Sequence, residues 1–256
     1  MQNQAFSETE VRQQVRTHYA AIALQAEKGC GCGCGTRPET LGYAAEDIAL
    51  APPGAEMGLG CGNPTALAAI QAGQTVLDLG SGGGFDCFIV ARKTGPTGRV
   101  IGVDMTPEMV AKARANTAKS GASNVEFRLG EIEHLPVADA SVDWVISNCV
   151  VDLSPNKAQV LAEAFRVLRP GGRLAISDIV ALQPIPEAVK ADFAAYAGCV
   201  AGAASVAEWQ TMLQRAGFNE VQIEIKEGSR AFIESWRQGA GEYVASANIT
   251  ARKPVA

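Results

Sequence analysis

The chain of 256 residues carries 22 Lys and Arg against 27 Asp and Glu, and 47% of its residues are hydrophobic. This composition is typical of a globular protein and provides enough apolar surface for a large core. No basic cluster supplies the long-range attraction that draws proteins to nucleic-acid phosphates, which argues against a nucleic-acid partner. The first residues lack the basic and apolar regions of a signal peptide, and no run approaches the ~18 apolar residues of a membrane span. We therefore expect a cytoplasmic protein with no membrane partner.

Cysteine usage indicates metal-binding or redox chemistry. The chain has 7 cysteines, and in the cytoplasm thiols are kept mostly reduced. An odd number also leaves one thiol over in any fully paired disulfide framework. A structural disulfide scaffold is thus disfavoured.

The first element that the pattern predicts is an amphipathic N-terminal helix. Ser7 and Glu10 match a capping box, and apolar residues then recur at helical spacing from Val11 to about Ala26. The stretch 28–62 is rich in Gly, Pro and Cys and predicts a long irregular loop. Loops of this length are usually functional or disordered.

Strands and helices alternate after this loop. Such alternation specifies an α/β fold, a doubly wound and mostly parallel sheet with helices on both faces. The expected strands are 75–79, 99–104, 125–129, 142–149, 174–178 and 221–225, and the expected helices are 64–70, 85–93, 107–119 (capped by Thr106), 157–168, 187–196 and 206–216.

Three parts are expected along the chain. Residues 1–73 form the N-terminal helix and the Cys/Gly-rich segment, and residues 74–226 form the core. Residues 227–256 are expected to be an appended α-helical or mixed module with a loose tail.

A glycine-rich turn follows the first core strand. The sequence GSGGG at 80–84 lies at the carboxyl end of strand 75–79, where open α/β sheets bind ligands. The second strand ends in Asp104, whose carboxylate suits the two hydroxyls of a ribose. A dinucleotide fingerprint would need a third glycine where this chain has Phe85, and Asp86 would repel a pyrophosphate. The turn alone also fits NAD, FAD or a plain βα connection, but these details favour S-adenosylmethionine.

Together with LRPGG at 168–172, these motifs resemble the class I methyltransferases over residues 74–225. The resemblance implies that the glycine loop holds the methionine part of S-adenosylmethionine and that the strand-two acid holds the ribose. It also implies that Glu131 and Ile132 flank the adenine and that Asn148 lies near the methionine or the methyl group. The expected cofactor-binding residues are Asp78, Gly80, Ser81, Gly82, Gly84, Asp104, Met105, Glu131, Ile132 and Asn148.

The end of the fourth core strand carries a cysteine. Methyltransferases that act on amino groups of nucleic acids typically have an Asn/Asp-Pro-Pro-aromatic motif there, whereas this chain has Asn-Cys-Val-Val at 148–151. A single free Cys149 would be a small buried hydrophobe. Cys61 and Cys199, however, also adjoin glycines, so that several thiols can approach one centre. Three thiolates suit a soft ion.

The motifs SNCVVDLSPNK, LGCGNPTALA and AGCVAGA together resemble the arsenite methyltransferases over most of the chain. The resemblance implies that Cys149 and Cys199 hold As(III) and that Cys61 completes the thiolate set. It also implies a cysteine of the CGCGC tract that exchanges thiols, and a small thiol or a thioredoxin-like dithiol protein as reductant. We expect a monomer without a tightly bound metal cofactor. The predicted catalytic set is Cys61, Cys149, Cys199 and Cys32, with Cys30 and Cys34 as alternatives to Cys32.

Little acid–base chemistry is needed for this reaction. Arsenic bound by three sulfurs keeps a lone pair as nucleophile, and alignment with the methyl carbon can contribute ~7–11 kcal/mol. Methylation formally oxidises arsenic, so thiols must return electrons, and Cys87 either joins this exchange or only packs its helix. Two other functions remain open: methylation of a small organic molecule such as a quinone or sterol, and metal binding by a thiol-rich protein, for which the C-x-C spacing is the main support.

Overall fold

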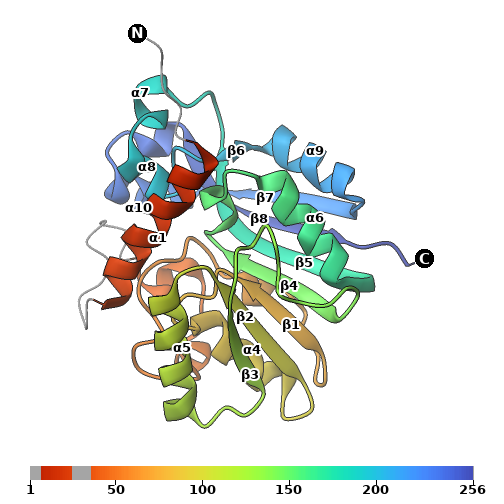
Figure 1. The fold of residues 1–256 in the computed structure, drawn as a ribbon. Coiled ribbons are helices and arrows are strands. Elements are labelled where there is room, and N and C mark those ends of the chain that lie inside the picture. Colours follow the sequence, from red (N-terminus) through yellow and green to blue (C-terminus); the bar gives the residue numbers. More distant parts are fainter. Residues whose placement is uncertain (1–6, 25–35, 256) are drawn as a thin grey trace.

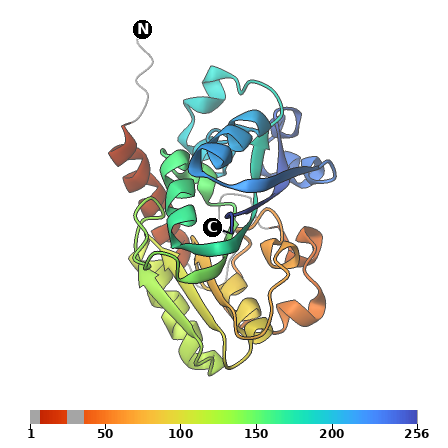
Figure 2. The same ribbon diagram turned by 90° about the vertical axis from the view of Figure 1, so that its right-hand side faces the viewer.

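An eight-stranded sheet organises residues 7–24 and 36–255, the part of the chain that the computed structural model describes (Figure 1). The strand order is β3-β2-β1-β4-β5-β8-β7, with the short β6 (Ala204–Ser205) beside β5. Figure 2 shows the twist of this sheet from the side. None of the helices in the described ranges is long and apolar enough to cross a membrane.

Five neighbouring strands are parallel, as expected. The chain winds from β1 to β2 and β3 and then returns to the other side of β1 as β4, so that the strand order reverses between β1 and β4. The carboxyl ends of strands at such a reversal are where α/β sheets bind ligands. These strands are β1 (Thr75–Leu79), β2 (Arg99–Asp104), β3 (Val125–Leu129), β4 (Val142–Asn148) and β5 (Leu168–Ala181).

Helices cover both faces of the sheet. On one face, α4 (Phe85–Thr94) and α5 (Pro107–Ser120) pack over β1, β2 and β3 and bury Phe88 and Val110. On the other face, α6 (Lys157–Val167) and α9 (Val206–Ala216) bury Trp209. The strands are therefore buried on both sides, which explains their nearly continuous apolar runs.

The N-terminal helix α1 (Glu8–Leu24) does not cover a sheet face. It packs against α5 and lies beside the carboxyl edge of the sheet (Figure 1). The expected apolar spacing is confirmed, because Val11, Val15 and Ile22 are buried. The capping box is present as well, since Ser7 and Glu10 bond to each other's backbone and side chain.

The C-terminal segment differs from the expected appended module. After α10 (Ser229–Trp236), the chain forms β8 (Val244–Arg252), an antiparallel strand between β5 and β7 (Asn219–Lys226). Its sequence VASANITAR includes Ala251 and Arg252, the first two residues of the tail that was expected to be loose. The strand was missed because small or polar residues give a weak hydrophobic signal: Ala245, Ser246 and Ala247 are fully buried although none is strongly hydrophobic.

Several element boundaries also differ from the sequence expectation. The LRPGG segment lies inside β5 at an irregularity in the pairing with β4, rather than in a turn before the strand. Thr106 precedes α5 without a side-chain cap. The expected helix 187–196 is broken at Asp192, and the expected helix 64–70 is shorter, although Asn63 caps it as expected. The shorter elements are η1 (Pro38–Leu41), α2 (Ala45–Ile48), α3 (Pro64–Leu67), η2 (Val151–Leu153), α7 (Glu187–Lys190), α8 (Phe193–Ala197) and η3 (Ala240–Glu242).

Candidate functional site

A cavity lies where β1, β2 and β4 end, beside α1. Its lining includes the glycine turn after β1, the end of β2 and the end of β4, together with residues of α1 and of the segment 38–60. Eight of the ten expected cofactor residues line it: Asp78, Gly80, Ser81, Gly82, Asp104, Met105, Ile132 and Asn148.

The glycine turn needs its glycines and leaves a polar atom free. A Cβ on Gly80 would lie 2.4 Å from the Val150 side chain, and Gly80 has a left-handed φ of 69°. Ser81 is 8% exposed, and its buried Oγ has no hydrogen-bond partner within the described residues. Buried hydroxyls are nearly always bonded. The turn therefore fits a ligand that offers Ser81 a polar partner.

Both carboxylate oxygens of Asp104 accept a backbone N–H at the cavity. Its Oδ1 accepts the backbone N–H of Thr106 at 2.8 Å, and its Oδ2 accepts that of Gly82 at 2.9 Å. Each oxygen keeps a lone pair for a further donor. Burial raises the pKa of this carboxyl, whereas the two N–H donors act in the opposite direction.

Two further carboxyl groups face the cavity. Tyr43 donates its hydroxyl to Asp86 at 2.6 Å, and Asn148 donates its Nδ2 to the other oxygen at 3.3 Å. Burial raises the pKa of Asp86 to about 6 and that of Asp78 well above its usual range. Within the described residues neither carboxyl forms an ion pair with a Lys or Arg, so a cationic ligand would relieve their desolvation.

Three cysteines from distant parts of the sequence meet behind this cavity. Cys149 follows β4 and lines the cavity, whereas Cys61 precedes α3 and Cys199 follows α8. All three are at most 5% exposed. The Sγ atoms of Cys61 and Cys149 and a carboxylate oxygen of Asp178 lie within 4.8 Å of one another, and Cys199 Sγ donates to the Cys149 carbonyl at 3.2 Å.

The backbone at two of these cysteines is unusual. Cys149 has φ 59° and Cys199 has φ 61°, a left-handed conformation that disfavours any residue with a Cβ. Local hydrogen bonds hold it: the Cys149 N–H donates to the Ser177 carbonyl at 2.8 Å, and the Cys199 N–H to the Tyr196 carbonyl at 3.0 Å. Strain of this kind persists where the surroundings over-determine the conformation, commonly at functional sites.

The Cys61 and Cys149 thiols are protonated at neutral pH. Burial raises the pKa of Cys61 to about 11. Hydrogen bonds with Cys199 and Cys61, followed by burial, raise the pKa of Cys149 well above its usual range. Asp178 accepts backbone N–H groups of Val151 and Ile179, and burial raises its pKa to about 6.

One side chain links the cavity to the thiols. Asn148 Oδ1 accepts the backbone N–H of Cys61 at 3.1 Å, while its Nδ2 reaches Asp86, the Tyr43 hydroxyl at 3.0 Å and the Gly62 carbonyl at 2.9 Å. Asn148 thus fixes Cys61 against the end of β4. A change at this amide would disturb both parts of the site.

Other predicted residues lie apart from this arrangement. Among the described cofactor candidates, Gly84 and Glu131 do not line the cavity. A Cβ on Gly84 would lie 2.7 Å from Phe127, so this glycine permits close packing of α4. Cys87 donates to Asp78 at 3.2 Å and is not part of the thiol cluster. The tract with Cys30, Cys32 and Cys34 lies outside the described residues.

Sequence reasoning missed several residues that shape the site. Tyr43 stands in a segment with no readable periodicity, and Asp86 was considered only as a charge that would repel a pyrophosphate. Asp178 could have been found, because it ends a predicted strand at the same sheet edge as the cofactor residues. Arg12 and Tyr19 line the cavity from α1, which was expected only to pack.

Comparison with known proteins gives consistent matches. Residues 70–217 match the family model described as a methyltransferase domain. An arsenite methyltransferase of Halobacterium salinarum is 53% identical over 262 residues, covering 96% of this chain. One of Aquipseudomonas alcaligenes is 41% identical over 171 residues, covering 64% of this chain. The crystal structure of an arsenic(III) S-adenosylmethionine methyltransferase from Chlamydomonas reinhardtii superimposes with a TM-score of 0.63 at 33% identity, covering 85% of this chain and 72% of that one.

The relatives are longer than this chain. The matched region spans 67% of the Halobacterium protein and 49% of the Aquipseudomonas protein. Both relatives therefore have further sequence beyond the matched region.

Proposed function

Because the chain belongs to the arsenite methyltransferase family, we propose that it transfers methyl groups from S-adenosylmethionine to As(III) held by Cys61, Cys149 and Cys199. One observation carries the proposal: Cys149 lines the cavity beside the glycine turn and also touches the two other buried thiols. Methyl donor and arsenic would then meet at the end of β4.

The cavity residues suit the donor. Asp104 accepts the ribose hydroxyls, and Ser81 with the glycine turn holds the methionine part. Asp86 and Asp78 complement the positive charge of its ammonium group. When bound, S-adenosylmethionine supplies an electrophilic methyl group on a sulfonium. Met105 and Ile132 offer apolar surface to the adenine.

Protonated thiols are the right partners for neutral arsenous acid. Three Cys–SH groups and As(OH)₃ give three As–S bonds and three molecules of water, so the thiol protons leave on the departing oxygen atoms. No base has to accept them, which agrees with the raised pKa values of Cys61 and Cys149. The three sulfurs leave the arsenic lone pair unshared, and the As–C bond can form as the C–S bond of the donor breaks. Holding the two reactants in line replaces a bimolecular encounter.

Turnover also needs electrons. Methylation formally converts arsenic to the pentavalent state, and two thiols that become a disulfide return two electrons. We assign one of these two thiols to Cys32, with Cys30 and Cys34 as alternatives, and the other to a cysteine of the arsenic-binding cluster. A small thiol or a thioredoxin-like dithiol protein then reduces the disulfide. Action in the cytoplasm as a monomer is part of the same proposal.

The test is methyl transfer from S-adenosylmethionine to arsenite with excess thiol, combined with a direct measurement of cofactor binding. Cys149→Ser and Cys199→Ser should abolish methylated arsenic while cofactor affinity stays within about twofold, because serine preserves volume but not soft ligation. Cys87→Ser is the matched control: it is equally buried but lies outside the cluster, so it should keep activity.

Other outcomes of this test would favour a different function. If the native chain binds the cofactor but leaves arsenite unmodified, a small organic substrate such as a quinone becomes the better hypothesis. If it binds no cofactor and only soft metal ions, the thiol-rich metal-binding function is favoured. Activity in Cys149→Ser would refute the arsenic ligand assignment.

A further inference from the structure

Helix α1 presents three residues to the cofactor cavity. Arg12, Val15 and Tyr19 line it from one face of the helix, at the spacing that brings residues into one row. At the far end of this row, Tyr19 donates its hydroxyl to the Ala197 carbonyl at 3.1 Å, two residues before Cys199. The helix therefore touches the cavity along its length and is attached next to a thiol residue.

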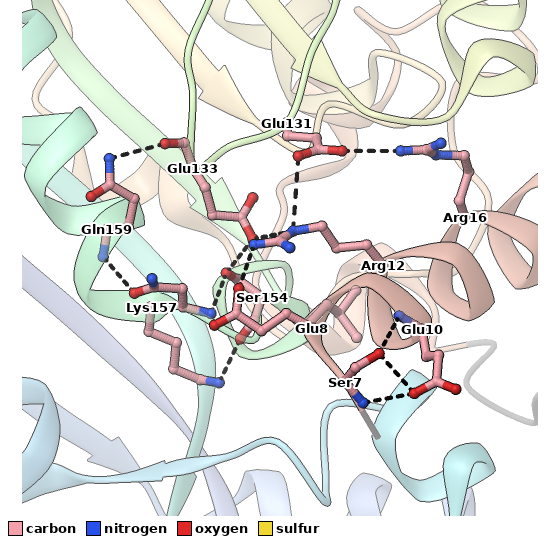
Figure 3. Close-up of polar contacts among 12 residues, drawn as sticks. Ser7, Glu8, Glu10, Arg12, Arg16, Glu131, Glu133, Ser154, Lys157 and Gln159 are labelled. Atoms are coloured by element: carbon pink, nitrogen blue, oxygen red, sulfur yellow. Dashed lines mark hydrogen bonds and ion pairs between the residues drawn. The ribbon is translucent and has the colours of Figure 1, made fainter. Parts of the chain in front are cut away.

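The other end of the row is attached through a buried carboxylate. Figure 3 shows Arg12 reaching from α1 toward Glu133, which lies on the loop after β3. Arg12 Nε donates to Glu133 Oε1 at 3.3 Å, and Ser154 donates its hydroxyl to the same oxygen at 2.7 Å. The Glu133 carbonyl accepts the Gln159 side chain at 3.2 Å. Glu133 thus joins α1 to the turn that follows Cys149 and to α6.

A second arginine of α1 makes a more exposed pair nearby. Arg16 bonds to Glu131 at 3.1 Å, and these side chains are 44% and 35% exposed. The Arg12 and Glu133 side chains are 20% and 4% exposed. Exposed ion pairs contribute little, whereas removing one partner of a buried pair leaves an uncompensated charge. Of the two, the Arg12–Glu133 pair is the one that can hold the helix.

We propose that Arg12 is a positioning residue for cofactor binding, which holds α1 closed over the cavity through its ion pair with Glu133. The cofactor then leaves only when this pair opens, and closure also sets the Ile132–Glu133 wall of the cavity. The inference rests on the proposed function in that the cavity takes S-adenosylmethionine. It does not depend on arsenic being the acceptor.

The experiment measures the dissociation constant and the dissociation rate of S-adenosylmethionine and of S-adenosylhomocysteine for the full chain without arsenite. Arg12→Met keeps the aliphatic stem and removes the charge. We expect its dissociation constant to rise about tenfold, mainly through faster dissociation, which is the size of one lost hydrogen bond to a charged group. Glu133→Gln keeps an acceptor for Ser154 and should have the same effect. Arg12 also pairs with Glu8 at 3.1 Å and with Glu131 at 3.8 Å, and Glu133→Gln leaves these two contacts in place. The double variant should be no weaker than Arg12→Met alone, because Arg12→Met already removes the pair with Glu133.

The control is Arg16→Met on the same helix, which should stay within about twofold of the native value. Equal weakening by Arg16→Met would overturn the proposal, since it would indicate a general charge effect of α1. Unchanged affinity and rate in both Arg12→Met and Glu133→Gln, with unchanged melting temperature, would overturn it as well. If Arg12→Met does not fold, Glu133→Gln decides alone. A native chain that binds no cofactor refutes the proposed function instead.

Discussion

The left-handed backbone at Cys149 and Cys199 allows a test of strain in the site. We compare Cys149→Gly with Cys149→Ala: both remove the thiol, but only glycine relieves the conformation at φ 59°. Cys87 is the matched position, because it is equally buried and free but lies within α4. The glycine–alanine difference in stability at Cys149, compared with that at Cys87, isolates the contribution of the left-handed backbone conformation.

The magnitudes follow from known terms. In α4, glycine should be less stable than alanine by about 1 kcal/mol from helix propensity, and by about 0.8 kcal/mol more from the lost buried methyl group. Cys149 lies outside a helix, between β4 and η2, so glycine there loses about 0.4–1 kcal/mol to its freer unfolded chain and about 0.8 kcal/mol to the missing methyl group. Relief of the left-handed conformation returns about 1–2 kcal/mol. Glycine and alanine should therefore be nearly equal at Cys149, whereas alanine is clearly better at Cys87.

Urea denaturation and thermal melting of the four variants measure these differences. For a chain of this size, about 1 kcal/mol corresponds to a shift of roughly 2–4 °C in melting temperature. Cys87→Ala should then melt at least about 3 °C above Cys87→Gly, and the Cys149 variants within about 2 °C of each other. If alanine exceeded glycine at Cys149 by as much as at Cys87, the left-handed conformation would cost nothing and the argument for a strained thiol site would be wrong.

Three further predictions concern pH and packing. Burial raises the pKa of Asp86 from 3.8 to about 6, so this carboxyl ionises more readily in the unfolded chain, and about 3 kcal/mol of stability is lost as pH rises from about 4 to about 6. The melting temperature of Asp86→Asn should lack this loss over the same pH range. The same fall of melting temperature with pH in Asp86→Asn and in the native chain would contradict the assignment. Burial raises the pKa of Cys61 to about 11, so the affinity for arsenite, measured by calorimetry, should be independent of pH between about 6.5 and 8.5. A tenfold rise of this affinity per pH unit would indicate that the thiolate form binds instead. A Cβ at position 84 would lie 2.7 Å from Phe127, so Gly84→Ala should unfold at a lower urea concentration than the native chain. The control is Gly121→Ala: nothing lies within 4 Å of a Cβ there, so this variant tests the positive φ alone and should lose less stability.

The parallel part of the fold could be predicted because its strands are apolar runs and its turns carry readable residues. Strands 75–79, 99–104 and 125–129 match the structure residue for residue. The antiparallel β8 was missed although residues 245–252 alternate apolar and polar as a strand does, because the apolar positions are three alanines and one isoleucine, which give a weak hydrophobic signal. Its burial comes from the strands on either side.

The positions of the candidate site residues could be predicted where a single motif marks them. Gly80, Ser81 and Asp104 are each marked by their place after a strand, and Cys61, Cys149 and Cys199 by their motifs. Glu131, by contrast, was expected at the cavity but points to Arg16 on α1. Pairings between distant elements, such as Arg12 with Glu133, leave no local signal in a single sequence. They depend on how α1 crosses the sheet edge.

The protonated thiols also suggest why this cluster would favour arsenite over divalent metal ions. A cation such as Zn²⁺ binds thiolates, so it must first displace protons from thiols whose pKa is raised, to about 11 at Cys61. Relative to an ordinary thiol, this costs roughly 3 kcal/mol at Cys61. Arsenous acid avoids the cost because its own hydroxyl groups carry the protons away as water. Burial therefore acts on the two kinds of ligand in opposite ways: it protects the thiols from metal ions and leaves them competent for a neutral oxyacid.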